Sequence, residues 1–307
     1  MCVPGDWDGS PAGDRALPRG RPERATPRNA IARREFQKRI VASAIGRHAA
    51  KRGTMLSNPT TSHHPAHRWC PACPLRRKPA FEPKSEKDVQ FISEMKMEHR
   101  RLPAGQEIIF PGQDDAELFT LFEGWAFRYK VLPDGRRQIL NFLLPGDLLG
   151  LQASLLAVAQ HGIEALTDVE LCVFPRRKVW DVFVRMPQLA YEMAWLGSRE
   201  ESLVDENLLS TGQRNAAERV AALVITLYRR AEALGLVTDR SFAFPLSQQQ
   251  LADALGLSLV HTNKTWAKLR RAGLFSYSDG RLTLENPRLT ERIAAQYERD
   301  VVQRPIL

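Results

Sequence analysis

Few cysteines and no long uninterrupted hydrophobic run occur in this sequence of 307 residues. Four cysteines in so long a chain do not make a disulfide framework, so we expect free thiols, metal ligands or redox-sensing thiols. The longest apolar stretch without charge, residues 148–163, contains Gln and His and is too short to span a bilayer. No signal-peptide pattern opens the chain. We therefore expect a cytoplasmic protein with no membrane partner.

Excess charge of one sign is scarce outside the first 54 residues. The chain carries a formal net charge of +9, with 44 Lys and Arg against 35 Asp and Glu. Residues 1–54 hold 12 against 5, which is +7, so the remainder holds 32 against 30, which is +2. Net charge is therefore weak evidence for nucleic-acid binding. The composition of residues 1–54 predicts a disordered basic extension, or a mis-assigned start upstream of Met55.

Signatures of catalysis are also missing. The sequence contains no P-loop, G-x-S-x-G, H-E-x-x-H or glycine-rich dinucleotide turn. A β-barrel metalloenzyme of the cupin type gathers several histidines inside its barrel, whereas only His161 lies between residues 99 and 185. We therefore expect no enzyme.

Glycines and alternating side chains predict a β-roll in the first half of the chain. Most of the glycines are 7 to 12 residues apart, the spacing of turns between short strands: Gly105, Gly112, Gly124, Gly135 and Gly146. Residues 127–131 alternate apolar and cationic, the period of a strand. Pro133-Asp134-Gly135 predicts a turn into residues 138–143. An antiparallel β-roll or jelly roll follows.

A long helix is expected from Pro187, because the fixed φ of proline suits a first helical turn. Apolar and polar residues then repeat in steps of four and three: Leu189, Met193, Leu196, Glu200, Leu203 and Asn207. This seam indicates either a helix packed on its own domain or self-association. We favour a homodimer, with Glu200 and Asn207 fixing the register. A second helix is expected over residues 215–234, ending at Gly235.

Residues 246–273 predict a helix-turn-helix. Ser247 and Gln250 form a capping-box pattern, Gly256 allows the left-handed residue of a tight turn, and Ser258 can cap a second helix. The first residues of such a second helix face base edges in the major groove. The expected DNA-contacting residues are Gln248, Ser258, Val260, His261, Asn263, Lys264 and Lys268. The hairpin expected around residues 278–280 would form a wing.

Four motifs resemble the Crp/Fnr superfamily of bacterial regulators, over about residues 70–295: Leu102–Phe110, Leu143–Gly150, Ala217–Ala221 and Gln250–Ser258. The resemblance implies an α+β protein that acts as a homodimer, binds a two-fold double-stranded DNA site and recruits or blocks RNA polymerase. The expected organisation is extension 1–54, arm 55–85, effector β-roll 86–185, dimerisation helix 186–212 and winged helix-turn-helix 213–300. The alternative is a binding module whose helix-turn-helix contacts protein.

Two departures limit what the resemblance implies. Where the family often has Glu-x-x-Ser/Gly-Arg, this chain has Val260, Asn263 and Lys264, so we expect Asn263 and Lys264 to carry base discrimination. Cyclic-nucleotide binders place an arginine soon after the glycine–acid turn to pair with the phosphate. Neither Arg nor Lys occurs between Arg137 and Arg176, so we expect no tight binding of cyclic AMP.

The cysteines resemble those of oxygen-sensing family members. Cys70 and Cys73 in the arm and Cys172 on the roll match three of the four iron–sulfur ligands, and Pro79 stands at the position of the fourth. The nearby His63, His64 and His67 offer imidazole in its place. Three alternatives remain open: a metal or cluster site at the three cysteines, a reversible disulfide, or no cofactor. The sequence also leaves open the identity of the effector and whether the protein responds to redox state or oxygen.

Overall fold

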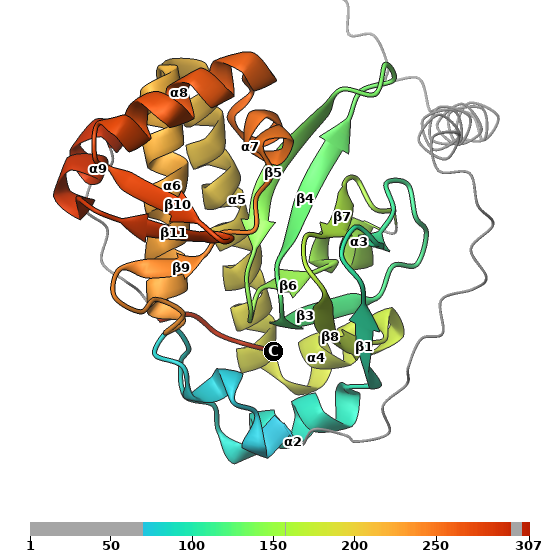
Figure 1. Cartoon of the computed structure of the whole chain (residues 1–307). Helices are drawn as coiled ribbons and strands as arrows, with labels where there is room; N and C mark the ends of the chain where they lie inside the picture. Colours follow the sequence, from blue (N-terminus) through green and yellow to red (C-terminus); the bar gives the residue numbers. More distant parts are fainter. Residues whose placement is uncertain (1–69, 157, 296–302) are drawn as a thin grey trace, which may run out of the picture.

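The computed structural model describes residues 70–156, 158–295 and 303–307, and the extension 1–54 and the three arm histidines lie outside these ranges (Figure 1). The arm contains two short 3-10 turns, and a helix follows it. Ser85 caps that helix by accepting a hydrogen bond from the Asp88 amide at 3.1 Å. These elements are η1 (Cys70–Ala72), η2 (Leu75–Arg77) and α2 (Glu86–Met95).

Two antiparallel four-stranded sheets form the predicted β-roll. One sheet has the order β1-β8-β3-β6, with β1 (Glu98–Leu102), β8 (Val169–Phe174), β3 (Leu118–Glu123) and β6 (Leu148–Leu149). The other has the order β2-β7-β4-β5, with β2 (Glu107–Ile109), β7 (Gly162–Ala165), β4 (Ala126–Val131) and β5 (Arg137–Leu143). The predicted turn at Gly135, where φ is +92°, joins β4 to β5. Apolar side chains of both sheets fill the interior, and α3 (Leu151–Leu156) follows β6.

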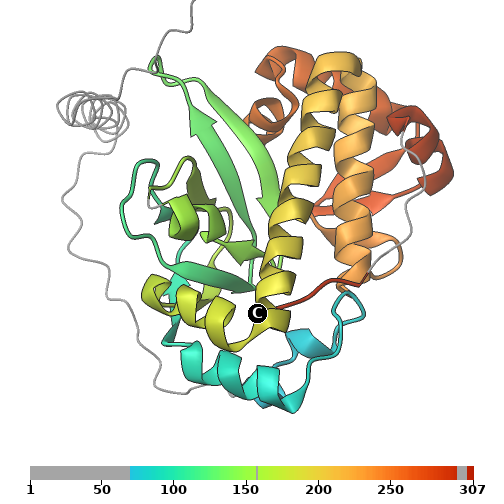
Figure 2. The ribbon, with the colours of Figure 1, turned by 180° about the vertical axis from the view of Figure 1, so that it is seen from behind.

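Helices connect the roll to the C-terminal part (Figure 2). A 3-10 turn leads into a short helix and then into the two long helices that the sequence predicts: η3 (Arg176–Lys178), α4 (Val179–Arg185), α5 (Pro187–Gln213) and α6 (Ala216–Ala233). Pro187 is in the first turn of α5, and Asn215 caps α6 in a capping box with Glu218. Among the described residues, no helix has both the length and the apolar character needed to cross a membrane.

The C-terminal part is a helix-turn-helix with a small sheet. Its elements are β9 (Ser241–Ala243), α7 (Gln248–Leu255), α8 (Leu259–Arg271), β10 (Phe275–Ser278), β11 (Arg281–Leu284) and α9 (Pro287–Ala294). The sheet has the order β10-β11-β9, so β9 adds a third strand to the predicted hairpin. Asp279 and Gly280, with φ of +51° and +72°, make the hairpin turn.

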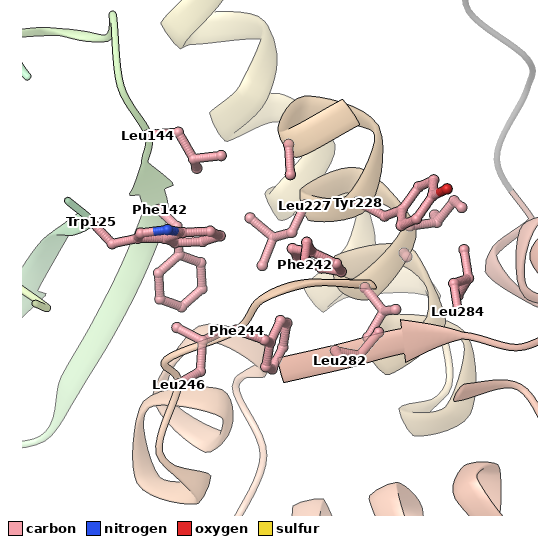
Figure 3. Close-up of a cluster of buried hydrophobic side chains, with 14 of the residues drawn as sticks. Trp125, Phe142, Leu144, Leu227, Tyr228, Phe242, Phe244, Leu246, Leu282 and Leu284 are labelled. Atoms are coloured by element: carbon pink, nitrogen blue, oxygen red, sulfur yellow. The ribbon is translucent and has the colours of Figure 1, made fainter. Parts of the chain in front are cut away.

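The roll and the helix-turn-helix share one apolar cluster (Figure 3). Trp125 and Phe142 of the roll belong to the same buried cluster as Leu227 of α6 and Phe242 of β9. Polar contacts join the same parts, because Arg137 Nε of β5 lies 3.0 Å from Asp253 Oδ2 of α7. The helix-turn-helix is therefore packed against its own β-roll.

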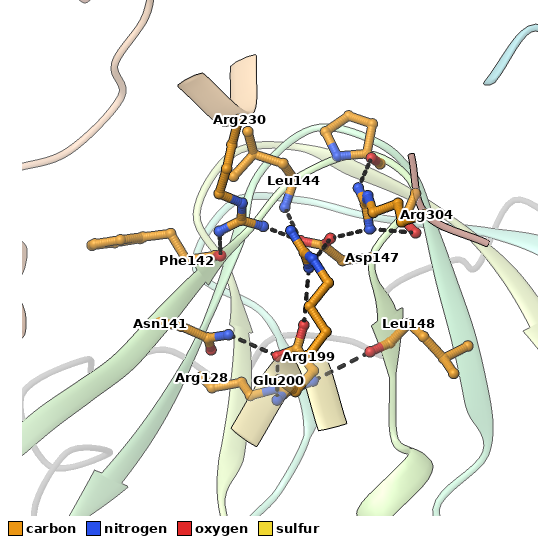
Figure 4. A network of polar contacts seen from close by, with 12 residues as sticks. Arg128, Asn141, Phe142, Leu144, Asp147, Leu148, Arg199, Glu200, Arg230 and Arg304 are labelled. Carbon is orange, nitrogen blue, oxygen red and sulfur yellow. Dashed lines mark hydrogen bonds and ion pairs between the residues drawn. The ribbon is translucent and has the colours of Figure 1, made fainter. Parts of the chain in front are cut away.

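A buried carboxylate joins the roll, α5, α6 and the C-terminal residues (Figure 4). Asp147 is fully buried and lies near the guanidinium groups of Arg230 at 2.5 Å, Arg304 at 2.6 Å and Arg199 at 3.9 Å. The Leu144 amide also donates to Asp147 at 2.8 Å. Burial alone would raise the pKa of Asp147, but the three arginines and this amide together hold it well below its usual value.

Candidate nucleic-acid interface

Local signals position α8 as the sequence predicts. Ser247 Oγ accepts from the Gln250 amide at 3.2 Å, and Gln250 Oε1 accepts from the Ser247 amide at 2.8 Å, which completes the capping box of α7. Gly256 ends α7 with φ of +63°, and Ser258 caps α8 through the His261 amide at 3.3 Å. The predicted helix-turn-helix is confirmed, and α8 begins directly after a tight turn.

One face of α8 is buried and the other is free for a partner. Thr262, Thr265, Trp266 and Leu269 pack inward, and the Trp266 ring lies 4.5 Å from the Phe275 ring, centroid to centroid. Most of the residues predicted to contact DNA are exposed: Ser258, Val260, His261, Asn263, Lys264 and Lys268. Arg270 and Arg271, which follow Lys268 in the sequence as further cationic residues, extend this exposed face.

Gln248 is placed differently from the other predicted contacts. It is the first residue of α7 and is half-buried. Its Oε1 is buried and accepts no hydrogen bond from the described residues. Gln248 therefore points partly into the protein, whereas the other predicted side chains face outward.

The exposed face of α8 is cationic. Lys264, Lys268, Arg270 and Arg271 are exposed, and the sequence of α8 contains no Asp or Glu. The wing contributes the exposed Arg281 at the start of β11. A helix with a basic exposed face and a polar, partly apolar N-terminal turn suits phosphate contact together with base-edge contact.

The predicted dimerisation seam faces the core of its own chain. Leu189, Met193 and Leu196 are 0%, 0% and 3% exposed and belong to a cluster with α2 and α4. Asn207 donates to the Leu140 carbonyl of β5, and Leu203 is half-buried beside it. The other interpretation of the seam, a helix packed on its own domain, fits these five side chains. The sequence does not separate the two interpretations, because both require the same apolar period.

The opposite face of α5 is exposed and partly apolar. Tyr191, Leu208 and Leu209 are 66%, 70% and 51% exposed. Ala194 and Ser198 lie between them on this face and are small and exposed. The sequence analysis missed this face; its signal was the adjacent Leu208-Leu209 pair, which does not fit the predicted seam.

The three candidate metal ligands line one cavity but are not arranged to hold a metal ion. Cys70, Cys73 and Cys172 are free thiols and share the cavity with His99. Lys96 Nζ lies 3.1 Å from His99 Nε2, so an ammonium group is next to the nitrogen that would have to bind a cation. Within residues 70–156, 158–295 and 303–307, no three His, Cys, Asp or Glu side chains are arranged to hold a metal ion. Burial raises the pKa of Cys172 to about 12; the nearby Lys96 acts to lower it, whereas Cys73, Cys70 and Glu170 act to raise it.

Comparison with known proteins identifies both halves of the structure. The cyclic nucleotide-binding domain family matches residues 99–185, and the Crp-like helix-turn-helix domain family matches residues 218–292. The nitrogen fixation regulation protein FixK of Bradyrhizobium diazoefficiens is 32% identical over 231 residues, which cover 74% of this chain and 94% of the relative. The transcriptional activator protein FnrL of Cereibacter sphaeroides is 26% identical, covering 73% and 88%.

Solved structures have the same fold. FixK2 from Bradyrhizobium japonicum superposes with a TM-score of 0.60 at 24% identity, over 66% of this chain and 99% of that chain. TTHB099 from Thermus thermophilus superposes with a TM-score of 0.53 at 25% identity, over 64% and 96%. The superpositions cover nearly all of both solved chains, and the two family models match the β-roll and the helix-turn-helix of this chain, so the predicted α+β architecture is confirmed. The chain belongs to the Crp/Fnr family of DNA-binding transcription regulators, and it is not an enzyme.

Proposed function

We propose that two copies of this chain bind a two-fold symmetric DNA site, each placing α8 in the major groove, and regulate transcription by contacting RNA polymerase. The exposed basic face of α8 is the observation that carries this proposal. The capped N-termini of α7 and α8 and the turn at Gly256 fix the position of this face. Base discrimination is assigned to Asn263 and Lys264, because an amide can bond adenine through two hydrogen bonds and a lysine can reach guanine.

Dimerisation is assigned to the exposed face of α5. Leu208 and Leu209 supply apolar area, and the small Ala194 and Ser198 would allow two helices to approach closely. A two-fold DNA site needs two recognition helices about one helical turn of DNA apart, which a single chain with one α8 cannot supply. The name of FnrL, a transcriptional activator protein, supports contact with the transcription machinery.

The test is DNA binding by the full chain as a function of salt. A duplex is first selected from random sequences on the purified protein, and its affinity is compared with that of a scrambled duplex by fluorescence anisotropy. We expect at least ~10³-fold tighter binding to the selected duplex. The logarithm of the binding constant should fall linearly with the logarithm of the salt concentration, because phosphate contacts release counterions.

A matched pair of variants locates the interface. Lys268→Ala should weaken binding and make the salt slope shallower by about 1, because its ammonium group is assigned to a phosphate. Lys87→Ala removes the same charge from the exposed side of α2 and should leave both quantities unchanged. Equal affinity for selected and scrambled duplexes, or identical salt slopes for the two variants and wild type, would contradict the proposal.

A further inference from the structure

Helix α7 covers an edge of the β-roll. Among the described strands, β5 is the last of its sheet, so one of its edges has no partner strand. Helix α7 lies beside β5 (Figure 1). Unpaired amides and carbonyls at a sheet edge attract other strands, and proteins often cover such an edge with a helix. The contact between β5 and α7 therefore joins the roll directly to the helix-turn-helix.

Two adjacent residues of β5 hold two adjacent residues of α7. Arg137 Nε donates to Asp253 Oδ2 at 3.0 Å. These two side chains are 24% and 12% exposed, so solvent screens the ion pair less than it would a surface pair. Gln138 Nε2 donates to the Ala254 carbonyl at 3.2 Å. The last carbonyls of a helix lack partners within the helix, so a donor from another element fixes that helix end.

The turn that follows α7 lies at the junction of the roll, α5 and α6. Arg219 of α6 donates from Nη1 to the Leu255 carbonyl at 3.0 Å, and from Nε to the carbonyl of Arg214, the C-cap of α5, at 2.8 Å. A Cβ on Gly256 would lie 3.6 Å from Thr211 Cγ2 of α5. Helix α8 begins three residues after Gly256, so these contacts hold its start close to the end of α5.

We propose that Arg137 and Gln138 are positioning residues for DNA recognition, because they hold the end of α7 on the roll and thereby fix the separation of the two α8 helices in the dimer. The assignment rests on the proposed two-fold DNA site, in which the half-sites are about one helical turn apart. One additional base pair between them increases their separation by ~3.4 Å and turns one relative to the other by about 35°. A firmly attached helix-turn-helix rejects this change, whereas a loosely attached one adapts to it.

The experiment compares two duplexes that differ in half-site spacing, using the full chain and fluorescence anisotropy. One is the duplex selected on the wild-type protein, and the other carries an additional base pair at its centre. The spacing ratio is the dissociation constant of the second divided by that of the first. We expect a ratio of about 100 or more for wild type, because the insertion misplaces one half-site. In Asp253→Ala, which loses the ion pair with Arg137, the ratio should fall about tenfold, the contribution of one hydrogen bond to a charged group.

A second variant and two controls separate positioning from folding. Gln138→Ala removes the donor to the Ala254 carbonyl without changing a charge, and adding it to Asp253→Ala should lower the ratio further. A duplex with a single half-site should bind Asp253→Ala as tightly as wild type, because the base contacts of α8 are unchanged. Glu291→Ala removes the partner of Arg229, at 2.9 Å within the C-terminal part, and should keep the wild-type ratio.

Hydrogen exchange of the free protein gives a readout that needs no DNA. Amides of residues 137–143 should exchange faster in the double variant than in wild type or Glu291→Ala, because α7 leaves the edge of β5 more often. Equal wild-type affinity for selected and scrambled duplexes contradicts the proposed function. With selective wild-type binding, the positioning role is overturned if the double variant keeps the wild-type ratio or exchange, or if Glu291→Ala lowers the ratio equally.

Discussion

Replacing Asp147 by asparagine should destabilise the protein more than any comparable surface substitution. The wild-type carboxylate is fully buried and shared by Arg199, Arg230 and Arg304. Asparagine keeps the shape but leaves the buried Arg304 guanidinium and the partly buried guanidinium groups of Arg199 and Arg230 without this anion, and its NH₂ group places hydrogen-bond donors next to the arginine donors. Removing one partner of a buried ion pair costs about 3–5 kcal/mol. Urea unfolding followed by circular dichroism should show a loss of this size in the free energy of unfolding at pH 7.

The pH dependence gives a second check on the same group. The pKa of Asp147 is lowered in the folded state, so its charge stabilises the protein above the unfolded-state pKa of ~3.9. That stabilisation is lost as the pH falls through the lower folded-state pKa. The difference between wild type and Asp147→Asn should therefore be full at pH 7 and shrink in strong acid.

A control and a double substitution test the reasoning. Asp181→Asn makes the same change on the exposed side of α4 and should leave the urea midpoint unchanged. Arg304→Met in the Asp147→Asn background should cost less than in wild type, because it removes one of the uncompensated charges, with a coupling above ~1 kcal/mol. The reasoning is refuted if Asp147→Asn lowers the free energy of unfolding by less than ~1 kcal/mol, or if the effects of the two substitutions on that free energy are additive. Either result would mean that the carboxylate does not hold these arginines together.

Three further predictions concern function. Asn263→Ala should reduce discrimination at one base pair of the selected duplex by ~1–3 kcal/mol, and equal binding of wild type and variant to that duplex would contradict the role of Asn263. Calorimetry with cyclic AMP should show no micromolar binding, because residues 138–175 contain no Lys or Arg; micromolar affinity would refute this. Leu209→Asp should shift the chain from dimer to monomer in analytical ultracentrifugation, whereas Leu156→Asp, at an equally exposed position on α3, should not. Unaltered dimers in both variants would exclude this face of α5.

Several elements were predictable because their signals act within a few residues. The capping box of Ser247 and Gln250, the left-handed Gly256 and the turn at Gly135 depend on side chains and backbone conformations that are adjacent in the chain. The helix-turn-helix, its exposed residues and the β4–β5 hairpin could therefore be located from sequence. Domain boundaries, the dimer face and the DNA contacts remain proposals that the experiments above address.

The sequence did not predict which face of α5 packs against its own domain and which is exposed. A heptad-like period states that one side of a helix is apolar, and it does so equally for a helix packed on its own domain and for one packed on a second chain. Leu189 and Met193 are buried because α2 and α4 lie against them, which depends on packing between distant segments. Local patterning therefore identified the helix, and the tertiary structure identified the face left free.

The sequence by itself determined the order of elements, the helix-turn-helix and the family resemblance, since these depend on short-range patterns. Only the tertiary structure showed that Arg304 binds Asp147, 157 positions away along the chain, and that the C-terminal residues close a cavity beside Cys172 and Lys96. Such contacts have no sequence period, because they form between side chains that only the packing of the roll, the arm and α6 brings together.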